Sequence, residues 1–264
     1  MRFSEHLRKA SLVGAFFVSV LLSLQAQALC SVSKPLQQVP VETVIDGDTL
    51  RLSDGRSVRL IGLNAPEIGR KGRQSEPFAQ SAKRRLHELV HANDGRVGLR
   101  FGPQARDHYG RALAHAFNAR GENLEALMLA EGLGFFVAIA PNTAFADCHL
   151  LAEHQARAAG RAIWRDSPVI PAERLRRGGF AVITARVERL ESNRGGIWLE
   201  LGGSTVLQIP RQAISHFGNT LRNLAGKEIE ARGWVIDRKG RVDLSHQARW
   251  LIKVSHPSML VVPD

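Results

Sequence analysis

The alternation of apolar and polar residues from Val41 to Val58 most constrains what this chain can fold into. Val44, Leu50 and Leu52 carry the apolar positions of the pattern. A period of two predicts β-strands that bury one face. Asp54-Gly55 is a strong signal for a two-residue hairpin between two such strands. The folded part of the chain is therefore expected to begin with a small, twisted antiparallel sheet.

More strands and three helices are predicted after this hairpin. The alternation returns at residues 97–101 and 112–117. Apolar residues recur at helical spacing in three segments, residues 78–90, 124–131 and 145–159. Ser75 is the expected N-cap of the first helix, and Gly132 and Gly160 are expected to end the other two. This order favours a barrel that carries helices over a parallel doubly wound sheet.

The N-terminus has the pattern of a secretory signal peptide over residues 1–28. Arg2, Arg8 and Lys9 precede an apolar run, and Ala26-Gln27-Ala28 supplies the small residues of a cleavage site. A membrane anchor is the alternative, but the run is shorter than the roughly 20 residues of a membrane-spanning helix. A lipid anchor at Cys30 is a further alternative, although no small residue precedes this cysteine. We expect an exported protein, periplasmic or secreted, without stable membrane association after cleavage.

The chain contains two cysteines, Cys30 and Cys148. An oxidising destination makes them a candidate disulfide. In the chain-entropy model, closing a loop of more than a hundred residues stabilises a protein by on the order of 4 to 5 kcal/mol. Two independent buried thiols are the alternative.

The charge is strongly basic, with a formal value of +11. Residues 29–169 hold eighteen Lys and Arg against fifteen Asp and Glu, and residues 170–264 hold fifteen against nine. Such a balance attracts polyanions without selecting DNA, RNA or another polymer. Pro, Gly and Arg are frequent at residues 167–178, which predicts a linker between a domain at 29–166 and a second domain at 179–264. The sequence does not indicate an oligomeric state.

The second domain has the pattern of five short strands and one helix. The strands are predicted at residues 182–190, 197–201, 205–209, 228–235 and 242–244, with a helix at 213–224. A helix between the third and fourth of five strands resembles an OB-fold barrel, a fold that often binds oligonucleotides or oligosaccharides. Trp198, Trp234 and Trp250 are either base-stacking residues of this barrel or part of its core.

Three polar segments in the first domain contain residue types suited to phosphodiester chemistry. They are Asp46-Gly47-Asp48-Thr49, residues 59–67 and Asp107-His108-Tyr109-Gly110-Arg111. Hydrolysis of a phosphodiester requires charge neutralisation, an activated water and stabilisation of developing charge. Carboxylates can hold a metal ion, and arginines can grip phosphate oxygens. Each segment also has an ordinary use, since Asp-Gly-Asp commonly caps a turn.

These three segments, with Gly160-Arg161-Ala162-Ile163-Trp164, resemble the thermonuclease family, also called staphylococcal nuclease-like, over about residues 41–165. The resemblance implies an OB-like barrel with three helices for the first domain. With the second OB-like barrel predicted from its own strand pattern, the expected fold class is mainly β with helices (α+β). The resemblance also implies a Ca²⁺-dependent nuclease that hydrolyses DNA and RNA with little sequence preference and leaves 3′-phosphate ends.

The matching positions imply a role for each site residue. Asp48, the Asn64 side chain and the Ala65 carbonyl would bind Ca²⁺. Glu67 would be the general base that orients the attacking water. Arg59 and Arg111 would grip the phosphoryl oxygens.

Nearby residues are candidates for substrate binding. Arg70, Lys71 and Arg73 form a short basic loop that could hold flanking phosphates or simply be solvated. Tyr109 could contact a phosphate or a base.

Two positions depart from the family pattern. Asn64 replaces the second metal carboxylate, so we expect weaker Ca²⁺ binding. Residues 135–142 lack the base-stacking tyrosines of the family. These departures keep two alternatives open: a nucleic-acid-binding protein whose nuclease site has decayed, and a protein that binds other polyanions through its second domain.

Overall fold

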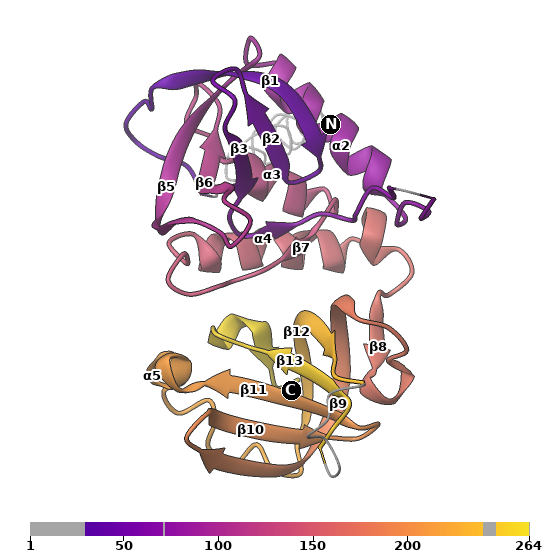
Figure 1. The fold of residues 1–264 in the computed structure, drawn as a ribbon. Coiled ribbons are helices and arrows are strands. Elements are labelled where there is room, and N and C mark those ends of the chain that lie inside the picture. Colours follow the sequence, from indigo (N-terminus) through magenta and orange to yellow (C-terminus); the bar gives the residue numbers. More distant parts are fainter. Residues whose placement is uncertain (1–29, 71, 240–246, 264) are drawn as a thin grey trace, which may run out of the picture.

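The computed structural model describes residues 30–70, 72–239 and 247–263, which form two β-barrels with several helices (Figure 1). The predicted signal peptide and Lys71 lie outside the described residues. The mixed α+β class and the presence of two small barrels confirm the fold predicted from the sequence. No helix among the described residues is long and apolar enough to cross a membrane.

The first barrel closes through five strands in the order β1-β2-β3-β6-β5. Their bounds are Gln38–Asp46, Thr49–Leu52, Ser57–Leu60, Ala112–Phe117 and Arg96–Arg106 for β1, β2, β3, β6 and β5. The expected hairpin joins β2 and β3, and Gly55 adopts a positive φ of 85° in its turn. β3 and β6 pair in parallel, whereas the other neighbours are antiparallel.

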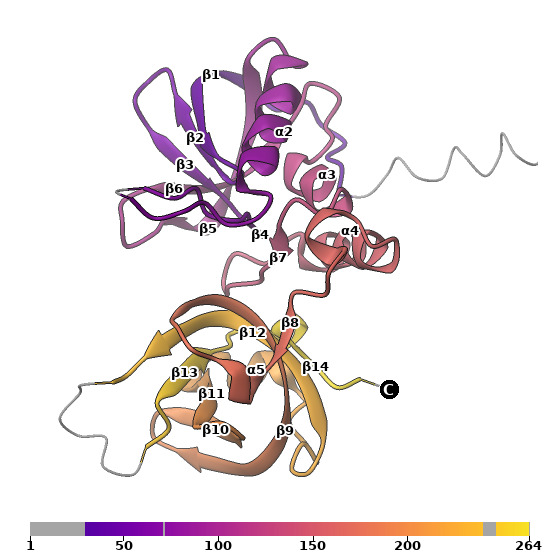
Figure 2. The same cartoon turned by 90° about the vertical axis from the view of Figure 1, so that its right-hand side faces the viewer.

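Helix α2 (Ala79–His91) packs along the side of this barrel (Figure 2). It buries Ala82, Leu86 and Val90. The prediction that Ser75 caps this helix is wrong, because the N-cap position is Phe78 and no side chain caps it. The Ser75 hydroxyl instead accepts a hydrogen bond from the Gly69 amide at 3.1 Å, so it fixes the preceding loop.

The other two predicted helices are α3 (Leu124–Ala130) and α4 (Ala146–Ala158). The Asn123 side chain caps α3 by accepting from the Ala126 amide. Gly132 and Gly160 follow the two helices with positive φ values of 71° and 58°. A small antiparallel pair, β4 (Leu63–Asn64) and β7 (Phe135–Phe136), lies beside these helices, and the short helix η1 (Ala162–Trp164) follows α4.

A disulfide joins Cys30 to Cys148 in α4, with the two Cα atoms 5.6 Å apart. It fastens the first described residue to a helix that lies 118 positions later. The N-terminal segment is also held by a hydrogen bond from the Val32 amide to the Gly121 carbonyl.

The second barrel is a ring of five strands, β9-β10-β11-β13-β12, which the β12–β9 pairing closes. The strands are Gly179–Asn193, Gly196–Leu201, Thr205–Pro210, Trp250–Lys253 and Glu228–Asp237 for β9, β10, β11, β13 and β12. The fifth strand was predicted at residues 242–244, which lie outside the described residues. In the ring, the fifth strand is β13, which pairs in parallel with β11. The predicted helix at 213–224 is also too long: η3 (Arg211–Ala213) and α5 (Ile214–Phe217) end at Gly218, whose φ is 48°.

The segment predicted as a linker contains regular structure. β8 (Val169–Pro171) pairs in parallel with β9, and the short helix η2 (Ala172–Arg174) follows. β8 thus extends the second sheet at one edge. At the other edge, η4 (Pro257–Met259) leads into β14 (Leu260–Val261), which pairs with β12.

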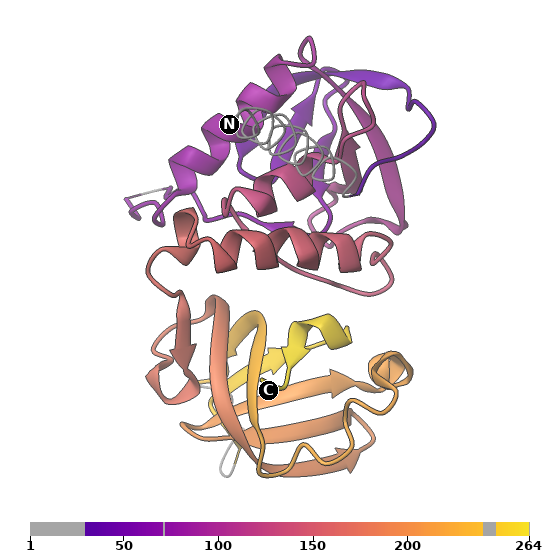
Figure 3. The ribbon, with the colours of Figure 1, turned by 180° about the vertical axis from the view of Figure 1, so that it is seen from behind.

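Helix α4 lies between the two barrels (Figures 1 and 3). The Arg232 side chain of β12 reaches into the first domain and donates to a carboxylate oxygen of Glu153 and to the Phe136 carbonyl. Arg157 of α4 pairs with Glu230 of β12 at 2.7 Å. Because Arg232 and Glu153 are both buried, the contact between the domains is partly an internal ion pair.

Candidate functional site

Four of the predicted site residues meet at one end of the first barrel. Asp48 lies in the turn between β1 and β2, Arg59 on β3, and Asn64 on β4. The Asp48 carboxylate accepts from the Ala65 amide at 2.8 Å and pairs with the Arg59 guanidinium at 3.0 Å. Arg59 also donates to the Asn64 side-chain oxygen at 3.2 Å. A single guanidinium thus bridges two of the predicted metal ligands.

The backbone holds Arg59 firmly in this position. Its second Nη group donates to the carbonyls of Leu60 and Leu63 at 2.7 and 2.6 Å. The turn beneath it requires Gly47, because a Cβ atom there would lie 2.6 Å from the Cβ atoms of Ala65 and Ala82. Close packing of α2 against the turn therefore fixes the Asp48 carboxylate as well.

The Asp48 carboxylate is electrostatically unusual. Its pKa is raised to about 7, chiefly by burial; Arg59 opposes this shift and the nearby Asp46 carboxylate adds to it. The Asp46 side chain also accepts from the Asp48 amide at 3.1 Å. A buried carboxylate with a raised pKa gains stability from added positive charge, so this position suits a bound cation.

Glu67 follows at the surface, after the buried Pro66. Partial burial of the Glu67 carboxylate raises its pKa, with further contributions from Asp46 and Glu76, while Arg59 and Arg111 oppose the shift. The backbone is pinned at this point, because the Glu67 amide donates to the Glu76 carboxylate and the Glu76 amide donates to the Glu67 carbonyl, both at 2.9 Å. Glu67 therefore lies within the field of both arginines on a constrained loop.

Arg111 precedes β6 and is held by Asp107. Its Nε group donates to the Asp107 carboxylate at 2.7 Å, and the other carboxylate oxygen accepts from the amides of Tyr109 and Arg111. The pairing of Arg111 with Asp107 uses one edge of the guanidinium. Among the described residues no other acid pairs with Arg111, so its two Nη groups remain for a ligand.

The remaining predicted residues lie around this centre. Tyr109 is 74% exposed on the turn before Arg111. Arg70 and Arg73 are exposed in the loop after Glu67, whereas Lys71 is outside the described residues. Sequence reasoning missed the roles of Asp46 and Glu76. Asp46 could have been found from its place in the Asp-Gly-Asp turn, but no local pattern indicated Glu76.

The oxygen atoms at this centre fit a hard cation such as Ca²⁺. The available donors are carboxylate and amide oxygens, which Ca²⁺ prefers. The fit is supported by the burial and the raised pKa of the Asp48 carboxylate, although the Arg59 guanidinium already uses an oxygen of Asp48 and of Asn64.

A second polar cluster lies inside the domain and was not predicted. Glu125 is buried and accepts from the Ala116 amide and the Asn123 side chain. His149 shares a hydrogen bond with the same Asn123 side chain at 2.8 Å, and His115 lies 3.4 Å from the Glu125 carboxylate. The cluster joins α3, α4 and β6, so its evident role is to connect these elements.

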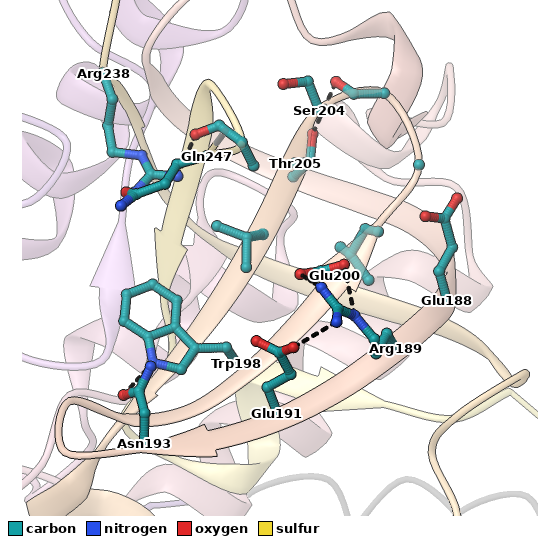
Figure 4. A pocket seen from close by; sticks show the side chains of 15 residues that line it. Glu188, Arg189, Glu191, Asn193, Trp198, Glu200, Ser204, Thr205, Arg238 and Gln247 are labelled. Atoms are coloured by element: carbon teal, nitrogen blue, oxygen red, sulfur yellow. Dashed lines mark hydrogen bonds and ion pairs between the residues drawn. The ribbon is translucent and has the colours of Figure 1, made fainter. Parts of the chain in front are cut away.

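The second barrel has a pocket of about 660 Å³ on its outer surface (Figure 4). Glu188, Glu191 and Glu200 line it, and Arg189 is paired with the last two at 2.6 and 2.7 Å. Its lining acids outnumber its arginines, because only Arg189 and Arg238 contribute positive charge. This excess of acids does not favour the binding of a nucleic-acid backbone in the pocket.

The three tryptophans of this barrel have different environments. Trp198 lines the pocket and donates to the Asn193 side chain at 2.8 Å. Trp250 is buried in the core, whereas Trp234 is 40% exposed and its ring packs against Phe180. Trp198 is therefore the member of the three that lines this pocket.

The proteins that this chain resembles in sequence are all described as nucleases or nuclease homologues. Residues 57–166 match the family described as staphylococcal nuclease homologue. The chain is 32% identical over 139 residues to endonuclease YncB of Bacillus subtilis, covering 51% of this chain and 64% of that protein. It is 31% identical over 136 residues to the SPbeta prophage-derived endonuclease YokF of the same organism, covering 50% and 45%. A thermonuclease of Staphylococcus hyicus is 29% identical over 131 residues, covering 48% and 76%. The chain thus spans less than two thirds of the two endonucleases.

Proposed function

The first domain belongs to the staphylococcal nuclease homologue family, and we propose on this basis that the chain is an exported, Ca²⁺-dependent nuclease. Its substrates would be DNA and RNA, cut with low sequence specificity. The observation that carries this proposal is the shared environment of Glu67: two arginines, Arg59 and Arg111, act electrostatically on one partly buried carboxylate at the surface.

Glu67 is the proposed general base. A raised pKa makes the ionised carboxylate a better proton acceptor. Its carboxylate would take a proton from the attacking water as the new phosphorus–oxygen bond forms. The bond to the 5′-oxygen would then break, and that oxygen would take a proton from solvent. The product ends would be a 3′-phosphate and a 5′-hydroxyl.

Arg111 and Arg59 would have different roles in binding the phosphate. Arg111 has its Nη groups available, so it would contact the phosphoryl oxygens directly in a bidentate manner. Both Nη groups of Arg59 already donate to protein oxygens, so it would act mainly through its charge and by holding Asp48 and Asn64 in place.

Asp48, the Asn64 side chain and the Ala65 carbonyl are the proposed Ca²⁺ ligands. When bound there, Ca²⁺ supplies positive charge next to the phosphate and a means of polarising water. The neutral Asn64 contributes an oxygen but no charge, so an Asn64→Asp variant is expected to need less Ca²⁺ for half-maximal activity. An unchanged calcium titration would contradict the assignment of this side chain.

A nucleic-acid-binding protein without cleavage is the second candidate. One observation favours it: Arg59 occupies oxygens of both Asp48 and Asn64, which are two of the three proposed metal ligands. A protein of this kind would retain the affinity of Arg111 for phosphate but not the hydrolytic step.

Digestion assays separate the two candidates. Single-stranded DNA, duplex DNA and RNA are incubated with the mature protein in Ca²⁺ or chelator, beside Glu67→Gln and Arg111→Ala. A Glu200→Gln variant in the second barrel is the matched control. Calcium-dependent cleavage that is lost in both site variants but kept in the control supports the nuclease. Intact substrates that still shift in a gel indicate binding without cleavage.

Export is tested separately from activity. The signal pattern predicts cleavage after Ala28. Mass spectrometry of the protein from the periplasm and the medium is expected to find Leu29 as the N-terminal residue. A full-length protein confined to the cytoplasm would contradict export and leave the nuclease proposal standing.

A further inference from the structure

A groove of about 460 Å³ begins at Arg111 and continues to the β2–β3 hairpin. It is lined by Asp54, Gly55, Arg56, Ser57, Arg106, Tyr109, Gly110 and Arg111. Arg111 is the single residue that the groove shares with the proposed catalytic residues. The groove is therefore continuous with the candidate site, yet most of its lining has no role assigned so far.

The walls of the groove are two hydrogen-bonded turns. In the hairpin, the Leu52 amide donates to the Arg56 carbonyl and the Gly55 amide to the Leu52 carbonyl, both at 2.9 Å. In the other turn, the Asp107 amide donates to the Arg111 carbonyl and the Gly110 amide to the Asp107 carbonyl, both at 3.0 Å. Such bonds keep the groove preformed, which reduces the cost of ordering it around a ligand.

The groove carries excess positive charge, with three arginines and one aspartate in its lining. Arg106 is exposed and donates to the Gly110 carbonyl at 2.8 Å, but it pairs with no carboxylate of the described residues. Arg56 pairs with Asp54 at 2.7 Å in an exposed position. Exposed ion pairs contribute little stability, so a phosphate can replace the aspartate at small cost.

Exposed rings accompany these arginines. Phe101 is 46% exposed, and the Arg56 guanidinium lies 5.9 Å from the centre of its ring. Tyr109 is 74% exposed, and the Arg111 guanidinium lies 5.5 Å from its ring centre. Positive grooves with adjacent aromatic rings bind single-stranded nucleic acids, because the arginines follow the phosphates and unpaired bases stack on the rings.

We propose that this groove binds the single-stranded polynucleotide next to the scissile phosphate, with Arg56 and Arg106 on flanking phosphates and Phe101 against a base. The inference rests on the proposed function and specifies its substrate as a polymer with unpaired bases rather than a single nucleotide ester. The pocket of the second barrel has more acids than arginines in its lining, so we do not assign it this role.

The binding experiment uses the full mature chain with Glu67→Gln, which prevents cleavage. Affinity for a short fluorescent oligothymidylate is measured over a series of salt concentrations, with and without the added changes Arg56→Gln and Arg106→Gln. Loss of two phosphate contacts to a single strand is expected to reduce the slope of log K against log salt by about 1.4. Phe101→Ala is expected to weaken binding about tenfold at every salt concentration, because one stacked base contributes roughly 1 to 3 kcal/mol. Arg189→Gln is the matched control in the second barrel, and circular dichroism checks the fold of each variant.

The cleavage experiment separates this inference from the proposed function. Arg56→Gln/Arg106→Gln, with Glu67 intact, is expected to lower kcat/KM for the oligothymidylate about tenfold or more, but to leave hydrolysis of a nitrophenyl ester of one nucleotide unchanged. Unchanged salt slope and unchanged oligonucleotide cleavage would overturn the groove assignment while the nuclease stands. If the parent cleaves neither substrate, the proposed function fails, and the salt slope alone decides whether the groove binds.

Discussion

The two barrels share one strand order but differ in what connects the third strand to the fourth. In each ring the third and fifth strands pair in parallel, β3 with β6 and β11 with β13. In the first barrel the connection contains β4, the Glu67 loop and the thirteen-residue α2; in the second it contains η3 and the four-residue α5. Asn64, Ala65 and Glu67 all lie on this longer connection. A common barrel thus supports the candidate chemistry in one domain only, because the chemistry depends on the connection.

The barrels also differ in how they place their charges. In the first barrel a buried aspartate faces a largely buried arginine at the candidate site. In the second barrel, pairs such as Arg249 with Asp237 lie at the surface. Buried pairs are strongly coupled and exposed pairs are screened by water. The predictions below use this contrast, beginning with the largest expected effect.

Removing one arginine from each barrel is expected to affect cleavage very differently. Arg111→Ala removes the proposed direct contact with the phosphate, so kcat is expected to fall about 10² to 10³-fold, as when one donor to a developing oxyanion is lost. Arg189→Ala, in the pocket of the second barrel, is expected to leave kcat unchanged. Steady-state cleavage of an oligonucleotide measures both. Equal losses would show that the second barrel takes part in the reaction.

Removal of Arg232 is expected to destabilise the protein more than removal of an exposed arginine. Arg232→Met leaves the buried Glu153 with the Phe136 amide but without its cationic partner, which is expected to cost about 3 to 5 kcal/mol. Arg249→Ala, at the exposed pair, is expected to cost about 0 to 1 kcal/mol. Urea-induced unfolding compares them. A double variant, Arg232→Met with Glu153→Gln, is expected to recover part of the loss; no recovery would show that packing rather than charge is responsible.

Loss of the disulfide is expected to affect the first barrel selectively. Replacing Cys30 and Cys148 with serine is expected to lower stability by about 2 to 5 kcal/mol. The bond lies entirely within the first domain, so faster amide hydrogen exchange is expected there and not in β9 to β13. The parent treated with reductant is expected to behave like the variant. Equal acceleration in both barrels would mean that the domains unfold together.

Asp48 of the first barrel and Asp237 of the second are expected to change the stability of the fold in opposite directions as pH rises. The raised pKa of Asp48 means that the folded state keeps a proton which the unfolded state loses, so its contribution to stability falls as pH rises from about 3.8 to about 7. Arg249 lowers the pKa of Asp237 to about 2, so that contribution is present above 3.8 and is lost as pH falls toward 2. In chelator, Asp48→Asn is expected to flatten the decline in unfolding midpoint between pH 4 and 7; an identical decline would assign it to other groups.

The sequence correctly predicted the features of the fold that depend on local patterns of residues. The Asp54-Gly55 hairpin, β6 and the glycines after α3 and α4 follow from patterns of a few residues, and the structure contains them. The candidate site residues came from ordered motifs, but their contacts did not. That Arg59 would bridge Asp48 and Asn64 depends on how β3 and β4 are placed in space, which no spacing along the chain encodes.

The errors have physical reasons as well. Ser75 has the residue type of an N-cap, yet its hydroxyl is used by the Gly69 amide in the loop. The helix expected at 213–224 is interrupted because Gly218 adopts a conformation that ends α5. Val169–Pro171 looks irregular in sequence, but the edge of the second sheet gives it hydrogen-bonding partners. Contacts with other segments outweighed local preference at Ser75 and at Val169–Pro171, whereas Gly218 is a local signal that the prediction of a longer helix overlooked.

The side chain of Arg232 also constrains how this protein can change over generations. Glu153 belongs to one domain and Arg232 to the other, and each neutralises the charge that the other buries. A lineage that exchanged the second barrel for another would need a new cationic partner wherever the new interface buried Glu153 again. Arg232 is therefore expected to vary less than the exposed arginines of β9 in chains that keep both barrels, whereas Glu153, which also accepts from the Phe136 amide of its own domain, is expected to persist in homologues without the second barrel.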